Sequence, residues 1–390
     1  MRRNSAPGTA CVVVNWNGGA DLLACLEALS GQTEPASEIV LADNGSTDGS
    51  ADAAAARFPS VRRLDLPHNP GFGGAVNAAA PATTAEILVI LNPDVVVEPD
   101  WLATVGAAFA DDSQLGVAGA KLLFPDGRVQ HAGGVLIPPL MLSDHRHYGA
   151  PDADDERNPI DVDYVTGAAM AVRRVAFEAV GGFDDGFFLY FEETDLCARV
   201  RAAGWRVRYL PRARAVHRES AVTGRGSAAY YRHYHHGRIR YALKHRRAAE
   251  VLSELVPAER RRLGVVNSLD ELVGLRHAFV DHAAALSRPD GAGLGADQPE
   301  LRPGLAYALA GLAENTVATV PFESWPPPAA PGRLGALKDL AAAARRLAEL
   351  ERRVAALERR ADIGPRWLVE LDQDLVALAR RAAEREQTDT

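Results

Sequence analysis

A carboxylate follows one strongly apolar stretch of this chain at the point where the stretch ends. Residues 87–91 form an unbroken apolar run of strand length, and Asn92, Pro93 and Asp94 come directly after it. Such a run is typical of a strand buried on both faces of a parallel sheet, and open α/β sheets bind ligands at the carboxyl ends of their strands. A carboxylate at that edge suits a hard divalent cation and the phosphates that it carries. The alternative is an ordinary strand-to-turn junction with an aspartate cap.

Two other predicted strands also end in side chains that could contact a nucleoside. Residues 9–14 are followed by Trp16, which offers an aromatic face. Residues 38–42 are followed by Asp43, which could accept a hydrogen bond from a ribose hydroxyl or a base N–H. Taken alone, the segment D-N-G-S-T-D-G is more typical of a solvated turn. The recurrence of such side chains at successive strand ends nevertheless favours a nucleotide site.

In chain order, a glycine cluster lies between the predicted strand that ends at residue 42 and the one that ends at residue 91. The segment N-P-G-F-G-G contains Gly71, Gly73 and Gly74, which either allow a ligand to approach the backbone closely or simply form a tight loop. The cluster is not the G-x-G-x-x-G pyrophosphate fingerprint, and no Walker lysine follows a glycine-rich loop. The sequence therefore argues against dehydrogenases and P-loop enzymes.

Three acids open a predicted helix further along the chain. Glu192, Glu193 and Asp195 would interact favourably with the dipole of that helix, and this capping role alone could explain them. They follow residues 187–191, F-F-L-Y-F, an aromatic run that would desolvate a neighbouring carboxylate. Desolvation raises the pKa of a carboxyl group toward that of a usable general base.

The elements that must position these side chains alternate between strands and helices. The alternation runs from residue 9 to a helix beginning near Pro99, and it predicts a mostly parallel, twisted α/β sheet with flanking helices. After residue 109 the pattern loosens. Residues 121–131 predict a hairpin, and residues 138–159 predict a long irregular segment, either a lid or a disordered insertion.

The last part of the predicted sheet contains two extended segments. Residues 163–173 include Gly167, which suggests close approach of a ligand or of another backbone. Residues 206–210 predict a short strand, and His217 follows beyond its end. A lone histidine is more often structural than catalytic.

Composition limits the class and location of the protein. With 390 residues, of which 47% are hydrophobic, the chain can bury a large α/β core and still have material left over. The formal net charge of -8 argues against nucleic-acid binding. The three cysteines have no metal-type spacing and fit a reducing compartment. No apolar run is long enough to span a bilayer, and the N-terminus lacks a signal-peptide core, so we expect a cytoplasmic protein.

One segment is strongly basic within this acidic chain. Residues 199–247 contain fourteen Lys and Arg residues against one acid, Glu219. The part at residues 227–247 mixes Tyr with Arg, Lys and His at helix-compatible spacing. It predicts either a helix that contacts the inner face of the membrane or an anionic acceptor, or a solvated helix packed on the preceding domain.

The C-terminal third is predicted to be helical. Residues 248–332 predict a helical extension with linkers at residues 288–299 and 323–333. In the tail at residues 333–390, residues 340–361 follow an apolar heptad. That tail is either a coiled coil that makes a homodimer or a helix folded back on its own domain.

The ordered set of motifs resembles a known enzyme family. The segments are V-V-V-N-W-N, L-A-D-N-G-S-T-D-G-S, N-P-G-F-G-G-A-V-N, L-N-P-D, G-G-F-D, F-L-Y-F-E-E-T-D-L-C-A-R and A-V-H-R-E-S. They occur in the order seen in family 2 inverting glycosyltransferases of the GT-A fold, and the chain most resembles the rhamnosyltransferase-like branch. The resemblance covers residues 9–245, which implies a catalytic domain at residues 1–247.

The resemblance implies a role for each matching residue. The nucleotide of a sugar-nucleotide donor would contact Asn15, Trp16, Asn17, Asp43, Asn44, Asn69, Gly71 and Asn92. Asp94 would bind a Mg²⁺ or Mn²⁺ ion that bridges the diphosphate, and His217 would contact that metal or the phosphates.

The general base is where the chain departs from the commoner pattern of the family. Glu193 matches the position of the base but replaces Asp, which leaves the assignment open between Glu193 and Glu192. A second departure concerns the metal, because N-P-D supplies one acid where D-x-D supplies two. This leaves the strictness of metal dependence open.

The reaction implied by the resemblance requires two chemical contributions from the active site. Displacement of a diphosphate from a sugar carbon requires charge neutralisation on the phosphates and deprotonation of the incoming hydroxyl, which a metal ion and one carboxylate supply. The expected activity is inverting transfer of rhamnose or another hexose from a dTDP- or UDP-sugar to a hydroxyl group. The acceptor would be a cell-surface polysaccharide, a lipid-linked glycan or a secondary metabolite.

Two alternatives stay open at the sequence level. A nucleotidyltransferase also uses an α/β sheet with acids at strand ends, but it would need a basic glycine-rich loop after the first strand, and N-W-N-G-G-A-D has no Lys or Arg. A non-catalytic scaffold that binds sugar nucleotides is the other alternative, favoured by the single acid in N-P-D and the helical tail.

Overall fold

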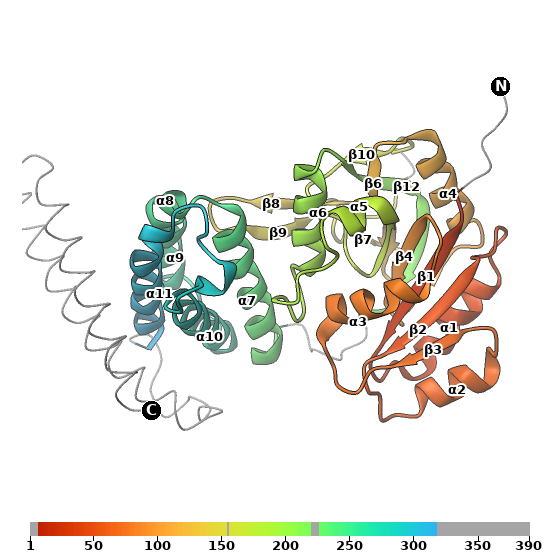
Figure 1. Cartoon of the computed structure of the whole chain (residues 1–390), viewed down its shortest axis with the longest axis horizontal. Helices are drawn as coiled ribbons and strands as arrows, with labels where there is room; N and C mark the ends of the chain where they lie inside the picture. Colours follow the sequence, from red (N-terminus) through yellow and green to blue (C-terminus); the bar gives the residue numbers. More distant parts are fainter. Residues whose placement is uncertain (1–6, 154–155, 220–225, 318–390) are drawn as a thin grey trace, which may run out of the picture. The chain divides into compact units, whose positions relative to one another are not determined.

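The computed structural model describes residues 7–153, 156–219 and 226–317 (Figure 1). The chain divides into two compact units. The sheet unit contains the described residues up to 137 and from 142 to 219, and the helical unit contains Pro138–Met141 and the described residues from 226 onward.

The helical unit begins before residue 247, where the sequence placed the end of the catalytic domain. α7 (Ala228–His245) belongs to this unit because it packs tightly on α10 (Leu269–Leu286). A Cβ atom added to Gly274 of α10 would lie 2.6 Å from the backbone of Tyr231 in α7. α7 therefore groups with the helices that follow it, whereas the sequence analysis placed residues up to 247 in the catalytic domain.

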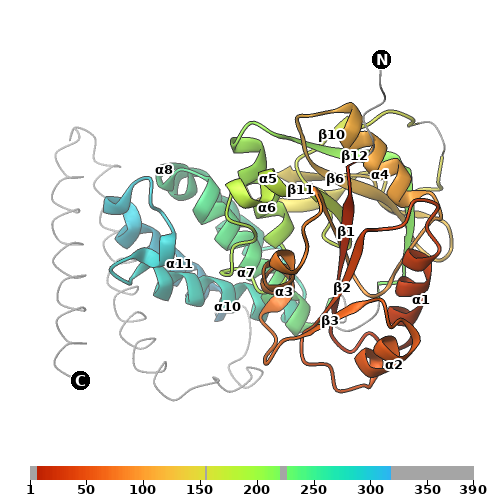
Figure 2. The ribbon, with the colours of Figure 1, turned by 45° about the vertical axis from the view of Figure 1, so that its right-hand side comes forward.

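Within the described residues, ten strands form one twisted sheet of mixed direction (Figure 2). They are β1 (Thr9–Asn15), β2 (Glu38–Asp43), β3 (Arg62–Asp65), β4 (Ile87–Leu91), β5 (Val95–Val97), β6 (Leu115–Leu123), β7 (Val129–His131), β10 (Ile160–Asp161), β11 (Ala169–Arg173) and β12 (Arg206–His217). The main order is β10-β12-β6-β11-β4-β1-β2-β3, with β5 paired to β12 and β7 paired to β6.

The direction of the strands refines the sequence-based expectation. β1 pairs in parallel with β2 and β4, β2 with β3, and β6 with β12. β11 runs antiparallel between β4 and β6 and joins the two parallel parts. The predicted α/β sheet with flanking helices is confirmed, and its direction is mixed rather than mostly parallel.

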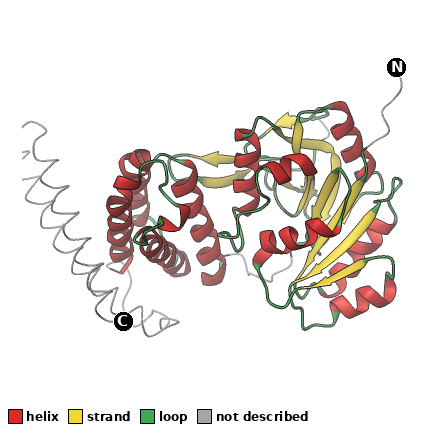
Figure 3. Ribbon diagram, viewed as in Figure 1, coloured by secondary structure: helices red, strands yellow, loops and turns green. Residues whose placement is uncertain are grey.

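Helices cover both faces of this sheet (Figure 3). One face carries α1 (Gly19–Ser30), α2 (Ser50–Arg57) and α4 (Trp101–Asp111), and the other carries α3 (Gly71–Ala79), α5 (Arg174–Ala179) and α6 (Glu192–Ala202). Side chains alternate along a strand, so Val13 of β1 joins the first apolar core and Val12 joins the second. Because both faces are covered, β1 and β4 are buried along their whole length.

Apolar packing, rather than capping, holds α1 in place. Its N-cap residue, Gly18, makes no side-chain hydrogen bond, so the helix lacks the stabilisation of about 1 kcal/mol that a capping side chain contributes. Leu22, Leu26 and Leu29 are buried in the core under the sheet. Full burial of each such side chain contributes about 1.5–3 kcal/mol, so the buried face outweighs the missing cap.

The strand that leads to His217 is longer than the sequence suggested. β12 does not stop at residue 210 but continues through Pro211 to His217. Its register with β6 shifts between Leu210 and Arg214. Proline has no N–H to donate, and it is tolerated in such an irregular stretch of a strand.

The long segment at residues 138–159 is also more regular than expected. β8 (Gly134–Ile137) and β9 (Leu142–His145) form an antiparallel hairpin, so β9 lies inside the segment that the sequence left irregular. The hairpin expected at residues 121–131 is confirmed, because β7 pairs antiparallel with the end of β6.

The helical unit has its own apolar core. Besides α7 and α10 it contains α8 (Ala248–Glu250), α9 (Val256–Leu263) and α11 (Arg302–Val317). Ser227 and Ser268 cap α7 and α10 with their side chains. Residues 288–299, predicted to be a linker, are part of this unit, because Leu294 is only 1% exposed and belongs to the core.

Two sequence-based expectations concern residues that the structure does not describe. The linker at residues 323–333 and the heptad at residues 340–361 both lie beyond residue 317. In the described part of the chain, no helix is both long enough and apolar enough to cross a membrane.

Candidate active site

The carboxyl ends of β1 and β2 are joined by a buried amide. Asn15 is fully buried, and its Nδ2 donates to Oδ1 of Asp43 at 2.7 Å, to Oγ of Ser46 at 3.0 Å and to Oγ of Ser50 at 3.1 Å. Its Oδ1 accepts from the backbone N–H of Gly18 at 3.1 Å. Every polar atom of this amide is used inside the protein. Asn15, predicted to contact the nucleotide, therefore holds two strand ends together.

Ser46 connects the other residues of these two strand ends. Its hydroxyl donates to Asp43 at 2.7 Å and accepts from the backbone N–H of Asn17 at 2.9 Å. The Oδ1 of Asn17 accepts from the backbone N–H of Thr47 at 2.8 Å. Trp16 stands between these anchored residues with 44% of its surface exposed. The network leaves the Trp16 ring accessible at this edge.

Asn44, which follows β2, faces the beginning of α3. Its Nδ2 donates to the backbone oxygen of Gly71 at 3.2 Å, and Oδ1 of Asn69 accepts from the Gly71 N–H at 2.9 Å. Asn44 is buried, and its Oδ1 has no hydrogen-bond partner among the described residues. A buried carbonyl oxygen without a partner is costly, and a donor group on a ligand would satisfy it.

Gly71 is required by its conformation and by its surroundings. Its φ is +83°, in the left-handed region, and a Cβ atom there would lie 2.2 Å from the backbone oxygen of Phe188. The next residue, Phe72, donates its N–H to the same oxygen at 3.2 Å. The glycine cluster thus brings the start of α3 against the aromatic run that precedes the acids.

At the end of β4, Asp94 meets the end of β12. The carboxylate is 6% exposed, and its Oδ1 lies 3.2 Å from Nε2 of His217. The pairing of β5 with β12 sets His217 opposite Val95, which places its ring beside Asp94. The backbone N–H of Arg218 also donates to the Asp94 backbone oxygen at 3.1 Å. The sequence pattern could not show this meeting, because it ended the strand at residue 210.

The residues at this end fit a cation that arrives with a diphosphate. Among the residues that the structure describes, no group of three or more His, Cys, Asp and Glu side chains could hold a metal ion alone. Asp94 and His217 supply one oxygen and one nitrogen donor. Mg²⁺ and Mn²⁺ sites of this kind commonly take one or two protein ligands and complete their shell with substrate phosphates and water. The donor set therefore fits a shared site.

α6 begins with two acids in an apolar environment. The two preceding residues, Tyr190 and Phe191, both have positive φ values of +66° and +69°, and this sharp reversal delivers the acids. Glu192 is buried, and its pKa is raised well above the ordinary range by burial and by the charge of Glu193. Burial raises the pKa of Glu193 to about 7, while hydrogen bonds from backbone N–H groups, including that of Gly167, oppose the shift.

The third acid of this helix has a different environment. Asp195 is fully buried and accepts from the guanidinium of Arg199 at 2.7 Å. Arg199 also donates to the backbone oxygens of Val180 and Gly182 at 2.7 Å. This closed ion pair fixes the loop before α6. Asp195 is therefore engaged by Arg199, and Glu193 and Glu192 are left as candidates for the base.

Gly167 and Ala168 connect the two acids Glu192 and Glu193 with the end of β4. The backbone N–H of Asn92 donates to Ala168 at 2.9 Å. A Cβ atom on Gly167 would lie 2.9 Å from the Phe72 ring and 3.7 Å from Cβ of Glu193. Among the described residues, Gly167 is therefore closely approached by the side chains of Phe72 and Glu193, and not by the other backbone that the sequence analysis offered as one alternative.

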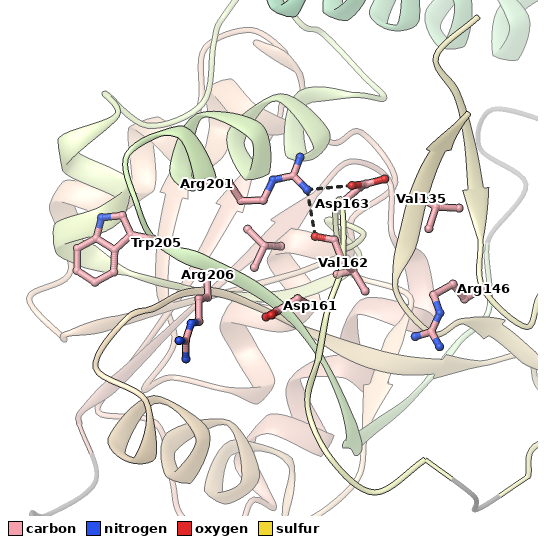
Figure 4. Close-up of a pocket in the computed structure, with 9 residues that line it drawn as sticks. Val135, Arg146, Asp161, Val162, Asp163, Arg201, Trp205 and Arg206 are labelled. Atoms are coloured by element: carbon pink, nitrogen blue, oxygen red, sulfur yellow. Dashed lines mark hydrogen bonds and ion pairs between the residues drawn. The ribbon is translucent and has the colours of Figure 1, made fainter. Parts of the chain in front are cut away.

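A separate hollow in the sheet unit lies away from these groups (Figure 4). It has a volume of about 530 Å³ and is lined by Arg201, Trp205 and Arg206 among others. Arg201 donates there to Asp163 and to the Val162 backbone. Arg206, which lines the hollow, opens β12, whereas His217, beside Asp94, closes it, so the two lie at opposite ends of that strand. We assign the chemistry to the strand ends.

Two residues of the site were missed by the sequence analysis. Ser46 lies within D-N-G-S-T-D-G, which was read as a turn, and Gln130 lies on β7, where its side chain contacts His217. The polar residues of the D-N-G-S-T-D-G turn were a signal for Ser46. No signal in the sequence pointed to Gln130.

Known proteins resemble this chain in sequence. Residues 7–236 match the model of the family described as glycosyltransferase like family 2. The chain is 31% identical over 250 residues to the N-acetylglucosaminyl-diphospho-decaprenol L-rhamnosyltransferase of Mycobacterium tuberculosis, an alignment that covers 57% of this chain and 80% of that protein. A rhamnosyltransferase of Escherichia coli K12 is 30% identical over 139 residues, which are 34% of this chain and 52% of that protein.

Solved structures resemble it in fold. The crystal structure of GalNAc-T7 with UDP, GalNAc and Mn²⁺ matches with a TM-score of 0.50 at 15% identity. The match covers 82% of this chain and 59% of that chain, so this chain spans less than two thirds of the GalNAc-T7 structure. At this identity the likeness shows the GT-A fold alone. The family model covers more than half of this chain and agrees with the resemblance of the motifs to rhamnosyltransferase-like enzymes. The chain therefore belongs to the glycosyltransferase-like family 2.

Proposed function

We propose that this glycosyltransferase inverts the anomeric carbon as it transfers rhamnose, or another hexose, from a dTDP- or UDP-sugar to a hydroxyl group of a lipid-linked glycan. The observation that carries the proposal is the carboxyl group of Glu193, half-buried beside Gly167 with a pKa raised to about 7. A base with a pKa near the working pH is the most effective. The lipid-linked acceptor rests on the name of the Mycobacterium tuberculosis relative, which acts on N-acetylglucosaminyl-diphospho-decaprenol.

Glu193 would accept the proton of the acceptor hydroxyl as that oxygen attacks the sugar. The bond from the oxygen to the anomeric carbon forms while the bond from that carbon to the diphosphate breaks, and the diphosphate leaves with the electron pair. Attack opposite the leaving group inverts the carbon in one step. No covalent sugar–enzyme intermediate is required, so positioning and electrostatics supply most of the rate gain.

Asp94 and His217 would hold the divalent ion of the donor. When bound, such an ion neutralises the negative charge that develops on the leaving diphosphate. The buried Asp94 carboxylate and the Nε2 of His217, 3.2 Å apart, support this role because they present an oxygen and a nitrogen donor to one position.

The nucleoside would lie against the β1 and β2 ends. The exposed Trp16 ring offers a surface for a base or a ribose. The Oδ1 of Asn44, buried and without a partner among the described residues, would accept from a base N–H. The Asn15 and Asp43 side chains bond to each other and to Ser46, so they support this surface from behind.

The proposal is tested by incubating the purified full chain with dTDP-rhamnose, UDP-glucose and UDP-N-acetylglucosamine, each with and without Mn²⁺. The acceptors are a short polyprenyl diphosphate carrying N-acetylglucosamine and the same sugar without the lipid. Mass spectrometry should detect a product heavier by the one sugar residue that the donor carries, and NMR should show an inverted anomeric configuration. Binding of donors without any product would instead support a scaffold. Release of pyrophosphate from a nucleoside triphosphate would support a nucleotidyltransferase.

A further inference from the structure

Gln130, on β7, lies between two polar or charged side chains that belong to other parts of the chain. Its side chain is 4% exposed, and its Oε1 is 2.7 Å from Nδ1 of His217. On the other side, its Nε2 donates to Oε2 of Glu219 at 3.3 Å. Neither the family resemblance nor the motifs of the sequence assign a role to this residue.

The position of Gln130 in the strand explains why its side chain reaches His217. His131 pairs with Leu122 of β6 and Val129 pairs with Leu123, so Gln130 is an extra residue between two consecutive pairs. Such a bulge turns a side chain away from its regular direction, and bulges are frequent beside active sites. β12 lies along the same strand β6, where Val216 pairs with Leu123. The bulge therefore aims Gln130 at the residue after Val216.

Glu219 decides which way the Gln130 amide faces. A carboxylate can only accept hydrogen bonds, so it requires the NH₂ end of the amide. The Oε1 end must then face His217. An amide oxygen also only accepts, so Nδ1 of His217 must carry a proton. The same rule applies to Nε2, which lies 3.2 Å from the Asp94 carboxylate: without a cation a proton on Nε2 would face Asp94, and a bound cation would take the place of that proton on the Nε2 lone pair.

We propose that Gln130 is a positioning residue that holds His217 in the Nδ1–H tautomer, so that Nε2 and the Asp94 carboxylate face one divalent cation together. The inference rests on the proposed function, because it deepens the role of the Asp94 and His217 pair. Histidines that ligate metals commonly donate their other ring N–H to an acceptor that fixes the tautomer. Gln130 would be that acceptor here.

The tautomer can be measured without turnover, in the presence of Mg²⁺ and UDP, so that a diamagnetic cation faces Nε2. We would label the full chain with ¹⁵N-histidine and record long-range ¹H–¹⁵N correlations at about pH 8, where an ordinary histidine is neutral. The signal lost in His217→Ala identifies His217. Wild type should show the proton on Nδ1, and Gln130→Leu should shift the population toward the Nε2–H form. A purely structural role for Gln130 would lower the melting temperature without changing the tautomer.

Cation binding provides the second readout. We would titrate Mn²⁺ into the protein in the presence of UDP and follow free Mn²⁺ by electron paramagnetic resonance. Gln130→Leu should weaken Mn²⁺ binding about ten-fold or more, the usual effect of removing such a supporting residue. Gln114→Leu is the matched control, because Gln114 is an exposed glutamine, and it should bind Mn²⁺ like wild type.

A charge exchange gives a rescue that a structural role would not predict. Gln130→Glu alone would place a carboxylate against the Glu219 carboxylate. Combined with Glu219→Gln, it again offers an acceptor to Nδ1 of His217 and a donor to position 130. The double variant should therefore show the Nδ1–H tautomer of His217 and most of the Mn²⁺ affinity of the wild-type protein.

Two results would overturn the inference. One is a wild-type His217 that carries its proton on Nε2 in the presence of Mg²⁺ and UDP. The other is a folded Gln130→Leu protein that keeps both the tautomer and the Mn²⁺ affinity of wild type. If wild type binds Mn²⁺ with UDP and shows the Nδ1–H form but transfers no sugar, the proposed function fails while the positioning role stands, since neither readout involves turnover.

Discussion

Replacing Glu193 by Gln tests the base most directly. Gln keeps the size of the side chain and its place at the start of α6, but it cannot take a proton from the acceptor. General-base catalysis typically contributes about 10²–10⁴-fold, so kcat should fall by about 10²-fold or more. Donor affinity should change little, because the carboxylate acts on the acceptor hydroxyl. The loss should therefore appear in kcat and kcat/KM alike.

The raised pKa of Glu193 also predicts how strongly kcat/KM depends on pH. With a pKa of about 7, the ionised fraction rises from about 9% at pH 6 to about 91% at pH 8, so kcat/KM should rise about ten-fold across this range. An ordinary glutamate, with a pKa of about 4.3, would be ionised throughout and would give a flat profile. The residual activity of Glu193→Gln should lose this ten-fold rise.

The assay measures initial rates of sugar transfer between about pH 5.5 and 8.5, with donor and acceptor saturating and then limiting. Glu192→Gln is the matched control, since it changes the adjacent acid in the same way. If Glu193→Gln keeps near-normal turnover and the wild-type pH profile, while Glu192→Gln loses both, the base has been placed on the wrong residue. Thermal melting of both variants separates lost chemistry from lost folding.

Three further predictions follow from the same geometry. Asp94→Ala should abolish Mn²⁺-dependent binding of the donor in calorimetry while the far-ultraviolet spectrum stays unchanged; undiminished metal-dependent affinity would contradict the assignment. Glu192→Gln should raise the melting temperature, and by more at pH 8 than at pH 5. The folded-state pKa of Glu192 lies above its unfolded value, so the wild-type protein loses up to about 1.4 kcal/mol of stability per pH unit above pH ~4.3. Glu300→Gln, at an exposed site, is the control and should show no such trend. In urea unfolding, Gly71→Ala should lose roughly 1–3 kcal/mol more of its free energy of unfolding than Gly127→Ala does. Both glycines have positive φ, but of the two only a Cβ at Gly71 would meet another atom, the Phe188 backbone oxygen at 2.2 Å. Equal losses would refute the packing argument.

The fold was predictable where single segments carry their own pattern. The apolar runs of β1 and β4 and the polar residues behind them were enough to predict a buried sheet with its ligands at one edge. The extent of β12 could not be predicted, because Pro211 normally ends a strand. Only the partner strand β6, with its shifted register at Leu210, shows how the strand passes the proline. Likewise, the antiparallel β11 depends on pairing with β4 and β6, which leaves no mark on its own residues.

Candidates for the base could be chosen where residue type alone restricts the chemistry. The acids in the first turn of α6 could be proposed as a base because the aromatic run before them is visible in the sequence. The separation of their roles was not visible, since it depends on Arg199 reaching Asp195. The hydrogen bonds that Asn15 makes inside the protein were not visible for the same reason. An asparagine at a strand end looks alike whether its amide meets a ligand or, as here, Asp43 and Ser46.

The two halves of the proposed reaction come from different parts of the sheet, and its mixed direction is what joins them. The parallel strands β1, β2 and β4 bring Trp16, Asn44 and Asp94 to one edge. β11 enters antiparallel beside β4, so the segment before it, with Gly167, starts at that same edge and reaches Glu193. A fully parallel strand in the place of β11 would begin at the opposite edge and leave the acids of α6 without this contact. In this fold the mixed topology therefore brings the acids of α6 to the edge formed by β1, β2 and β4, as the proposed reaction requires.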